Sequence, residues 1–357
     1  MMPVHHDEQF MRRALALAKK GRTSPNPRVG AVIVRGGSVI GEGYHRKAGQ
    51  PHAEREALRA ADGAEGATLY VTLEPCSHYG RTPPCTDAII SAGITRVVCA
   101  VEDPNPAVSG IELLRAAGID VEVGLMAEEA RALNEAYFFA MERGRPYFVL
   151  KTAMSLDGKT ATRGGDSMWI TSPASRDHAH RLRGEHDALV VGIGTVLSDN
   201  PRLRAVDGPD PLRIILDSSL RLPLDAAVLG DRNVLVVTTA RADAAKVEAL
   251  RARGAEVLVC GDHRVDLPAL AAALHEREIR SVLLEGGSAV HGAFMDEGLV
   301  DKVMVYIAPL LIGGASAVLA VGGTGVERLA DAMRLGAVTV QRLGDDLLVT
   351  GTPQTRP

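Results

Sequence analysis

The feature that most constrains this chain is one histidine, one glutamate and two cysteines at the expected starts of helices. His52-Ala53-Glu54 begins one helical stretch, and Pro75-Cys76 and Pro84-Cys85 follow the next apolar strand. The positive end of a helix helps to keep a nearby thiol ionised. We therefore expect a fold in which the start of one helix meets the loop and helix that follow the next strand.

His52, Cys76 and Cys85 are zinc ligands by type, whereas Glu54 is not needed as one. A structural zinc site closes its tetrahedron with a fourth protein ligand, and a catalytic site keeps that position for water. The motif supplies three ligands, which indicates hydrolytic deamination with Glu54 moving protons between a zinc-bound water and an amino-bearing ring. Eight residues separate the two cysteines where two are usual, which favours a small-molecule deaminase over one acting on nucleic acids.

Length, charge and composition narrow the class of protein to which the chain can belong. A chain of 357 residues suits about two domains. The net charge of -4 and the 3% aromatic content argue against nucleic-acid binding. The N-terminus has no apolar signal core, and no apolar run is long enough for a membrane span. Four cysteines do not form a disulfide framework, so we expect a cytoplasmic protein.

Longer motifs in both halves resemble a known family. In the first half they are Pro25-Asn-Pro-Arg-Val-Gly30, Gly41-Glu-Gly-Tyr-His45, Ala48 to Glu54, Val71 to Cys85 and Asp103-Pro-Asn-Pro106. In the second half they are Lys151 to Gly158, Trp169 to Pro173, Gly194 to Asp199 and Leu284 to Gly287. In this order they resemble the bifunctional riboflavin-biosynthesis deaminase/reductase family over nearly the whole chain.

The element pattern is α/β in both halves. Asp7 is expected to cap a first helix, and a helical stretch over 127–142 precedes the boundary at Arg143-Gly144-Arg145-Pro146. Domains are thus predicted at residues 1–145 and 146–357. Near-continuous apolar strands in the second half favour a covered parallel sheet, with antiparallel edge strands at its end. The resemblance implies a cytidine-deaminase-like α/β/α sandwich followed by a dihydrofolate-reductase-like α/β domain.

For the first half, the resemblance implies a phosphoribosylaminopyrimidine substrate that is deaminated to the corresponding uracil. Asn26, between two prolines, is either a ring contact or part of a plain turn. His45 and His78 either touch substrate or face solvent, and Glu74 either braces the site or caps a turn. The loop after Gly110 is about two residues shorter than in the family, because Ile111 follows at once.

For the second half, the resemblance implies NADPH-dependent reduction of the ribosyl group to ribityl. The positions expected to contact NADPH are Ala153, Trp169, Thr195, Asp199, Ser218, Glu285, Gly286 and Gly287. Those expected to contact substrate are Ser167, Arg183, Leu203 and Glu285. Val206 stands where the family places a phosphate-binding arginine, so Arg204 or Arg202 is expected to take that role.

Three alternatives stay open from the sequence. The chain could be a base deaminase acting on RNA or DNA, or a non-catalytic scaffold stabilised by zinc. It could also be an enzyme in which only one half is active. We expect a homo-oligomer, either a dimer or a tetramer, and no membrane or nucleic-acid partner.

Overall fold

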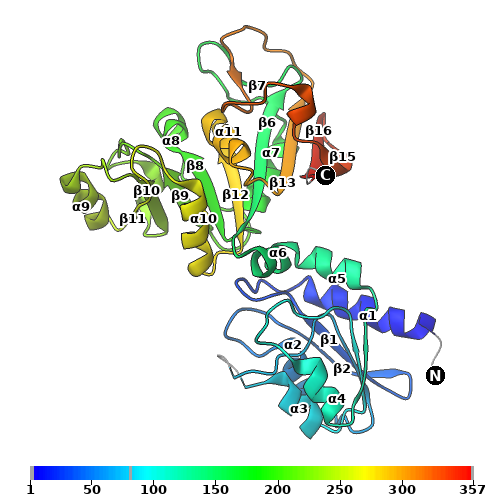
Figure 1. The fold of residues 1–357 in the computed structure, drawn as a ribbon. Helices are drawn as coiled ribbons and strands as arrows, with labels where there is room; N and C mark the ends of the chain where they lie inside the picture. Colours follow the sequence, from blue (N-terminus) through cyan, green and yellow to red (C-terminus); the bar gives the residue numbers. More distant parts are fainter. Residues whose placement is uncertain (1–3, 80–82, 355–357) are drawn as a thin grey trace. The chain divides into compact units, whose positions relative to one another are not determined.

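The computed structural model describes residues 4–79 and 83–354. Residues 80–82, part of the motif between Cys76 and Cys85, lie outside the described residues. The chain divides into two compact units, Met1–Gly144 and Arg145–Pro357 (Figure 1). This division falls one residue before the boundary predicted from the sequence.

The first unit is built on a five-stranded sheet in the order β2-β1-β3-β4-β5. β1 pairs antiparallel with both β2 and β3, whereas β3, β4 and β5 run parallel. The strands are β1 (Gly30–Arg35), β2 (Ser38–Tyr44), β3 (Thr68–Val71), β4 (Arg96–Cys99) and β5 (Asp120–Val123). The helices are α1 (Val4–Ala18), α2 (Ala53–Ala60), α3 (Cys85–Ser91), α4 (Gly110–Ala116), α5 (Ala127–Leu133) and α6 (Glu135–Arg143).

Helices cover both faces of this sheet, which gives the predicted three-layer sandwich. α1 packs on one face, and α2, α3 and α4 lie side by side on the other (Figure 1). α2 approaches β2 so closely that a Cβ atom on Gly43 would lie 2.3 Å from the carbonyl oxygen of Ala53. Only glycine permits this approach. Because Ala53 follows His52, the same packing fixes the start of α2 relative to the sheet.

Two local expectations were wrong. Asp7 lies inside α1 and does not cap it; its buried carboxylate pairs with Arg96 at 2.7 Å and accepts a hydrogen bond from Tyr70. The expected helix over 127–142 is two helices that meet at Asn134. The Asn134 side chain accepts from the backbone nitrogen of Arg28 at 2.7 Å and donates to its carbonyl oxygen at 2.9 Å. Such side-chain bonds to backbone compete with helix continuation.

The second unit contains a nine-stranded sheet in the order β11-β10-β9-β8-β12-β6-β13-β16-β15, with a separate β14-β7 pair. Its strands are β6 (Tyr147–Ser155), β7 (Lys159–Ala161), β8 (Ala188–Gly192), β9 (Leu212–Leu216), β10 (Val234–Thr238), β11 (Glu256–Val259), β12 (Ser281–Gly286), β13 (Lys302–Ala308), β14 (Val318–Leu319), β15 (Leu335–Leu343) and β16 (Asp346–Pro353). Its helices are α7 (Pro173–Arg183), α8 (Ile193–Asp199), α9 (Ala244–Ala252), α10 (Leu267–Glu276) and α11 (Ser288–Asp296), with short 3-10 turns η1 (Ala227–Gly230) and η2 (Leu329–Asp331).

The parallel part of this sheet sets the position of a ligand site. All neighbours from β11 to β13 pair in parallel, and β16 and β15 add an antiparallel edge, as predicted. The chain runs outward from β8 through β9 to β11 and then returns to place β12 between β8 and β6. Ligands of α/β sheets bind at the carboxyl ends of strands where the chain changes direction in this way. Among the described residues, no helix could span a bilayer.

Candidate metal centre and cofactor site

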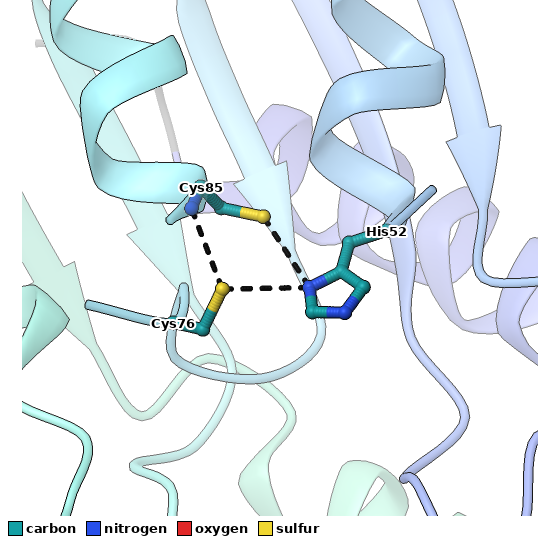
Figure 2. Close-up of side chains that lie close together, drawn as sticks. All are labelled: His52, Cys76 and Cys85. Atoms are coloured by element: carbon teal, nitrogen blue, oxygen red, sulfur yellow. Dashed lines mark hydrogen bonds between the residues drawn. The ribbon is translucent and has the colours of Figure 1, made fainter. Parts of the chain in front are cut away.

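Three metal-binding side chains meet in the first unit. His52 directly precedes α2, Cys76 lies in the loop after β3, and Cys85 is the first residue of α3 (Figure 2). His52 Nδ1 lies 3.4 Å from Cys76 Sγ and 3.5 Å from Cys85 Sγ. Ligand atoms on one tetrahedral zinc ion are about 3.5–3.8 Å apart. The donor set and its spacing therefore fit zinc, and this is the one such cluster in the part of the chain that the structure describes.

The two thiols are not equivalent. A hydrogen bond from the Cys85 thiol, together with the hydrogen bond and charge of His52, holds the pKa of Cys76 well below its usual value against the opposing effect of burial. The backbone nitrogen of Cys85, at the start of α3, also donates to Cys76 Sγ at 3.3 Å. Cys76 is therefore poised as a thiolate, which is the form that binds a metal.

Glu54 lies in the first turn of α2 and is 3% exposed. Its Oε2 atom is enclosed and has no hydrogen-bond partner among the described residues. Burial, reinforced by the charge on Cys76, raises the pKa of Glu54 from 4.5 to about 6. A carboxylate with a pKa in this range can both take up and release a proton near neutral pH.

Asn26 and His45 form a hydrogen-bonded chain beside His52. The buried His45 ring lies edge-on to the His52 ring, with centroids 5.0 Å apart. His45 Nδ1 is 3.1 Å from the carbonyl oxygen of Pro51, and Nε2 is 3.2 Å from Asn26 Nδ2. Because a carbonyl only accepts, Nδ1 carries the proton and Nε2 accepts from the amide. Asn26 thus offers its Oδ1 to a ligand, whereas His78 is exposed.

The loop between Asp103 and Ile111 is held by Glu74. Its carboxylate accepts from the backbone nitrogens of Asp103 at 3.1 Å and Ile111 at 3.0 Å, which are the two ends of the loop. Ser109 also donates its backbone N–H to Ser77 Oγ at 2.8 Å, next to Cys76. Glu74 therefore fixes both ends of this loop, one of them in the first turn of α4.

In the second unit, residues expected to bind the cofactor follow neighbouring parallel strands. They are Ala153 within β6, Thr195 in α8 after β8, Ser218 after β9, and Glu285, Gly286 and Gly287 at the end of β12. Gly287 donates its backbone N–H to Thr195 Oγ1 at 3.0 Å, which joins the β12 and β8 ends directly. The glycine backbone and the hydroxyl lie where a helix N-terminus follows, an arrangement suited to a cofactor's pyrophosphate.

Glu285 is bound to Arg183 by two contacts of 2.8 and 2.7 Å. Burial opposes ionisation of Glu285, but the charges of Arg183 and then Lys151 outweigh it and lower its pKa to about 2. Burial lowers the pKa of Lys151, whose ammonium lies 5.6 Å from the ring centroid of Tyr306. This end of β12 therefore combines a permanent carboxylate with two cations.

The remaining predicted residues are spread along loops. Trp169 is 67% exposed and stacks against the Arg176 guanidinium at 4.5 Å, so it is not a core anchor. Ser167 is half-buried two residues earlier. Asp199 ends α8 and is exposed. The structure thus brings Glu285 into contact with Arg183 and Gly287 into contact with Thr195, and it leaves Trp169 and Asp199 open to solvent.

Comparison with known proteins decides the family. The cytidine and deoxycytidylate deaminase zinc-binding region matches residues 4–101, and the RibD C-terminal domain matches residues 146–349. The riboflavin biosynthesis protein RibD of Aquifex aeolicus is 46% identical, covering 96% of this chain and 97% of its own. The chain belongs to the RibD family. The Escherichia coli RibD protein is 43% identical, over 96% of this chain and 98% of its own.

Solved structures support the same family assignment. Acinetobacter baumannii RibD (form 2) has a TM-score of 0.91 and 40% identity, covering 98% of this chain and 99% of its own. A deaminase/reductase from Thermotoga maritima has a TM-score of 0.86 and 38% identity, with coverage of 98% and 99%. The chain is thus a bifunctional enzyme of riboflavin biosynthesis, with a zinc-dependent deaminase domain and an NADPH-dependent reductase domain. The predicted fold class, function and cofactors are confirmed.

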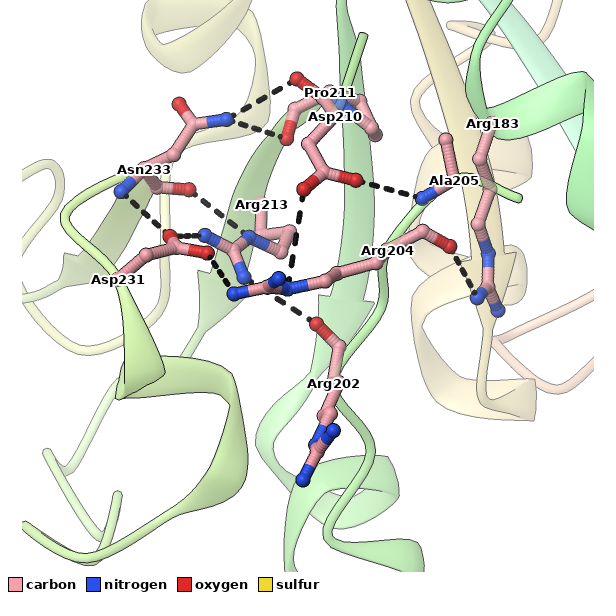
Figure 3. A network of polar contacts seen from close by, with 9 residues as sticks. All are labelled: Arg183, Arg202, Arg204, Ala205, Asp210, Pro211, Arg213, Asp231 and Asn233. Atoms are coloured by element: carbon pink, nitrogen blue, oxygen red, sulfur yellow. Dashed lines mark hydrogen bonds and ion pairs between the residues drawn. The ribbon is translucent and has the colours of Figure 1, made fainter. Parts of the chain in front are cut away.

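The two candidate phosphate-binding arginines have different surroundings (Figure 3). The Arg204 guanidinium pairs with Asp231 at 2.9 Å and lies 3.9 Å from Asp210. The Arg202 guanidinium points away from both carboxylates, and its backbone carbonyl accepts from the buried Arg213 at 3.3 Å (Figure 3). Arg202 therefore keeps its positive charge available to an anion, whereas the charge of Arg204 is largely balanced.

Lys151 begins one of the second-half motifs, but the sequence alone indicates no role for it. The available signal was a single lysine in the otherwise uncharged strand Tyr147–Ser155. A charged residue inside a central strand is unusual unless it is paired or functional. Leu203 lies on the same loop as Arg202, is 4% exposed and has a φ of 55°.

Proposed function

We propose that the chain catalyses two consecutive reactions of riboflavin biosynthesis. The first unit converts 2,5-diamino-6-(5-phosphoribosylamino)pyrimidin-4-one to 5-amino-6-(5-phosphoribosylamino)uracil by hydrolysis. The second unit reduces the ribosyl group of that product to ribityl with NADPH. The observation that carries the proposal is the meeting of His52, Cys76 and Cys85 beside the buried Glu54 carboxylate, whose Oε2 has no hydrogen-bond partner among the described residues. The deaminase and reductase activities by which the Thermotoga maritima relative is named support the same pair of reactions.

In the deaminase unit, His52, Cys76 and Cys85 would hold zinc and leave its fourth position to water. Bound zinc supplies a hydroxide near neutral pH by lowering the pKa of that water. Glu54 would take one proton of that water at its unpaired oxygen and pass it to the ring nitrogen, and would then carry the second proton, from the oxygen added to the ring carbon, to the departing ammonia. Its raised pKa suits both halves of this transfer.

Asn26 is the proposed pyrimidine contact. One N–H of its amide is bound to His45, which fixes the amide orientation and leaves Oδ1 to accept a hydrogen bond from an N–H group of the substrate. His45 acts through Asn26, because the proton on its Nδ1 is held by the Pro51 carbonyl. Exchange of the two amide atoms would place a donor against the substrate's own donors.

In the reductase unit, the backbone from Glu285 to Gly287 and the hydroxyl of Thr195 are proposed to hold NADPH, together with Ala153, Trp169, Asp199 and Ser218. The nicotinamide supplies the hydride when bound, and the protein orients the two reactants. Arg183 and Glu285 are proposed to contact the substrate with Ser167 and Leu203. Arg202, in preference to Arg204, is proposed to bind the ribosyl phosphate, because its guanidinium is not balanced by a carboxylate.

We also propose that the protein forms a homo-oligomer. β15 is a nine-residue edge strand whose second edge is unpaired among the described strands, and Val338 and Val340 on it are 52% and 62% exposed. An apolar edge of this length favours pairing with another chain. Light scattering on the purified protein distinguishes monomer, dimer and tetramer. The four free cysteines suit a reducing compartment such as the cytoplasm.

The deciding experiment supplies the diaminopyrimidine to the purified protein with and without NADPH. Ammonia release and loss of NADPH absorbance are followed separately. We expect ammonia in both samples and NADPH oxidation only after ammonia release has begun. Ammonia without oxidation, or the reverse with the uracil intermediate, would mean that only one unit is active. Turnover of tRNA or single-stranded DNA, with none of the pyrimidine, would instead support the base deaminase.

A further inference from the structure

His291 occupies an unusual position within the second unit. It lies in α11, is 2% exposed, and its two ring nitrogens face two different backbone carbonyls. Nε2 is 3.2 Å from the carbonyl oxygen of Leu284, and Nδ1 is 3.0 Å from that of Ala320. A carbonyl can only accept, and burial lowers the pKa of His291, so the neutral ring carries one N–H and donates to only one of the two carbonyls at a time.

The Leu284 carbonyl lies next to an irregularity in the pairing of β12. The pairing of β12 with β8 shifts register between Leu284 and Gly286, so Glu285 forms a bulge in the strand. Gly286 follows with a φ of 101°, in the region that favours glycine. A Cβ atom on Gly286 would lie 3.1 and 3.2 Å from Cε1 and Nε2 of His291. The imidazole therefore packs directly against the turn that it also binds.

This turn carries the groups proposed to hold NADPH. Its last residue, Gly287, donates to Thr195, and its first, Glu285, is fixed by Arg183. Between these two attachments, the ring of His291 is packed against Gly286, and its Nε2 faces the Leu284 carbonyl. A bulge places a side chain or backbone group in a direction that a regular strand does not allow.

The other ring nitrogen serves a different segment. The chain over 320–325 is fastened to α11 by further bonds: Gly322 donates to the Ser288 carbonyl at 3.0 Å, and Thr324 donates to Asp296 at 2.7 Å. These bonds hold the segment without a hydrogen bond from Nδ1 to Ala320, so the single ring proton is assigned to Nε2, which faces the Leu284 carbonyl. The two nitrogens of His291 can be tested separately.

We propose that His291 is a positioning residue for NADPH, acting from its Nε2 through the Leu284 carbonyl and the Gly286 backbone. The proposal rests on the proposed function in one respect, namely that the turn from Glu285 to Gly287 binds the cofactor. His291 itself need not touch NADPH. Without it, the bulge can relax toward regular pairing with β8, and the backbone N–H of Gly287 loses its orientation.

The test compares three substitutions in the full-length, zinc-loaded protein. Glutamine places its amide nitrogen near the position of Nε2, asparagine near that of Nδ1, and leucine supplies neither donor. NADPH affinity is measured by nicotinamide fluorescence, and substrate KM by NADPH oxidation. His291→Leu and His291→Asn should weaken NADPH binding roughly tenfold or more, as expected for a lost bond to a buried carbonyl. His291→Gln should stay within about threefold of the native protein.

Substrate KM should change less than about threefold in all three variants, and ammonia release should be unchanged. His275→Leu is the matched control, because His275 is a partly buried histidine on α10 that contacts Arg280. It should bind NADPH like the native protein. Thermal unfolding is recorded for each variant. If His291→Leu does not fold, the comparison of glutamine with asparagine decides.

Native NADPH affinity in both His291→Leu and His291→Asn would overturn the inference. Equal weakening in the glutamine and asparagine variants would also overturn it, because the effect would then come from lost packing and not from the Nε2 contact. If the native protein itself does not bind NADPH, the proposed cofactor site fails first and the inference with it. NADPH binding by the native protein tests the cofactor site. The difference between the glutamine and asparagine variants tests the Nε2 contact.

Discussion

Replacing Glu54 with glutamine should have opposite effects on activity and stability. Glutamine has nearly the same shape but cannot carry the proton, so deamination should fall at least ~100-fold if Glu54 does general acid-base work. Zinc content should remain, because Glu54 is not one of the three clustered ligands. NADPH oxidation with the uracil intermediate should also remain, because that reaction uses the second unit.

The stability effect follows from the buried charge. Because the pKa of Glu54 is about 6 in the folded chain and 4.5 ordinarily, the folded state binds its proton more tightly than the unfolded state. The resulting stabilisation is present below about pH 4.5 and is lost as the pH rises through about 6. At ~1.36 kcal/mol per pH unit, the charged carboxylate costs the zinc-free protein about 2 kcal/mol at pH 7. Glu54→Gln should recover about this amount.

Hydrogen exchange of first-unit peptides over a urea series would measure this difference in the zinc-free, full-length protein. The gain should be present at pH 7 and absent near pH 4, where Glu54 is protonated. Glu56→Gln is the matched control, since Glu56 lies on the same helix and pairs at the surface with Arg59. It should change stability by less than about 1 kcal/mol. Near-normal ammonia release, or a pH-independent loss of stability in Glu54→Gln, would refute the reasoning.

Three further outcomes are expected. Cys85→Ser should lose zinc and ammonia release but keep NADPH oxidation with the uracil intermediate, because serine is a poor zinc ligand; full zinc content by atomic absorption would exclude Cys85 as a ligand. Arg202→Ala should raise the reductase's substrate KM about tenfold or more, and Arg204→Ala should change it less, because a charge-assisted phosphate bond contributes ~1.5–3 kcal/mol; the reverse order would assign the phosphate to Arg204. Arg183→Ala should lower substrate affinity roughly ten- to a hundredfold, a larger effect than on NADPH affinity. It should also introduce an acid limb in the reductase pH profile, because Glu285 loses the partner that lowers its pKa; an unchanged profile would contradict that pairing.

The metal centre was predictable because its residues sit at fixed points of local structure. His52 and Cys85 flank helix starts, and Cys76 follows a strand, so the order of elements alone brings them together. The two wrong expectations concern residues whose partners lie far away in the sequence. The local sequence predicts Asp7 as a helix cap, because nothing near it indicates its partner Arg96, which is 89 residues away. Asn134 interrupts a helix because its side chain binds the backbone of Arg28, 106 residues earlier.

The choice between Arg202 and Arg204 shows the same limit within one loop. Both have the same charge and differ by two positions in the sequence. Only the fold places Asp231 beside Arg204, from a turn 27 residues further along the chain. Local pattern predicts which residue types are present, whereas long-range pairing decides which of them keeps its charge for a ligand.

Glu54 and Glu285 connect this argument to the chemistry of the two units. Both carboxylates are buried, so burial alone would raise the pKa of each. Glu54 has an unpaired oxygen and a pKa of about 6, whereas Glu285 is bound by Arg183 and has a pKa of about 2. The first can exchange a proton at neutral pH, and the second cannot. A reaction that releases ammonia needs proton exchange, whereas a hydride transfer from NADPH needs a fixed charge that orients its substrate. Whether a buried carboxylate is paired with a cation thus decides whether it can carry a proton, as Glu54 can, or holds a fixed charge, as Glu285 does.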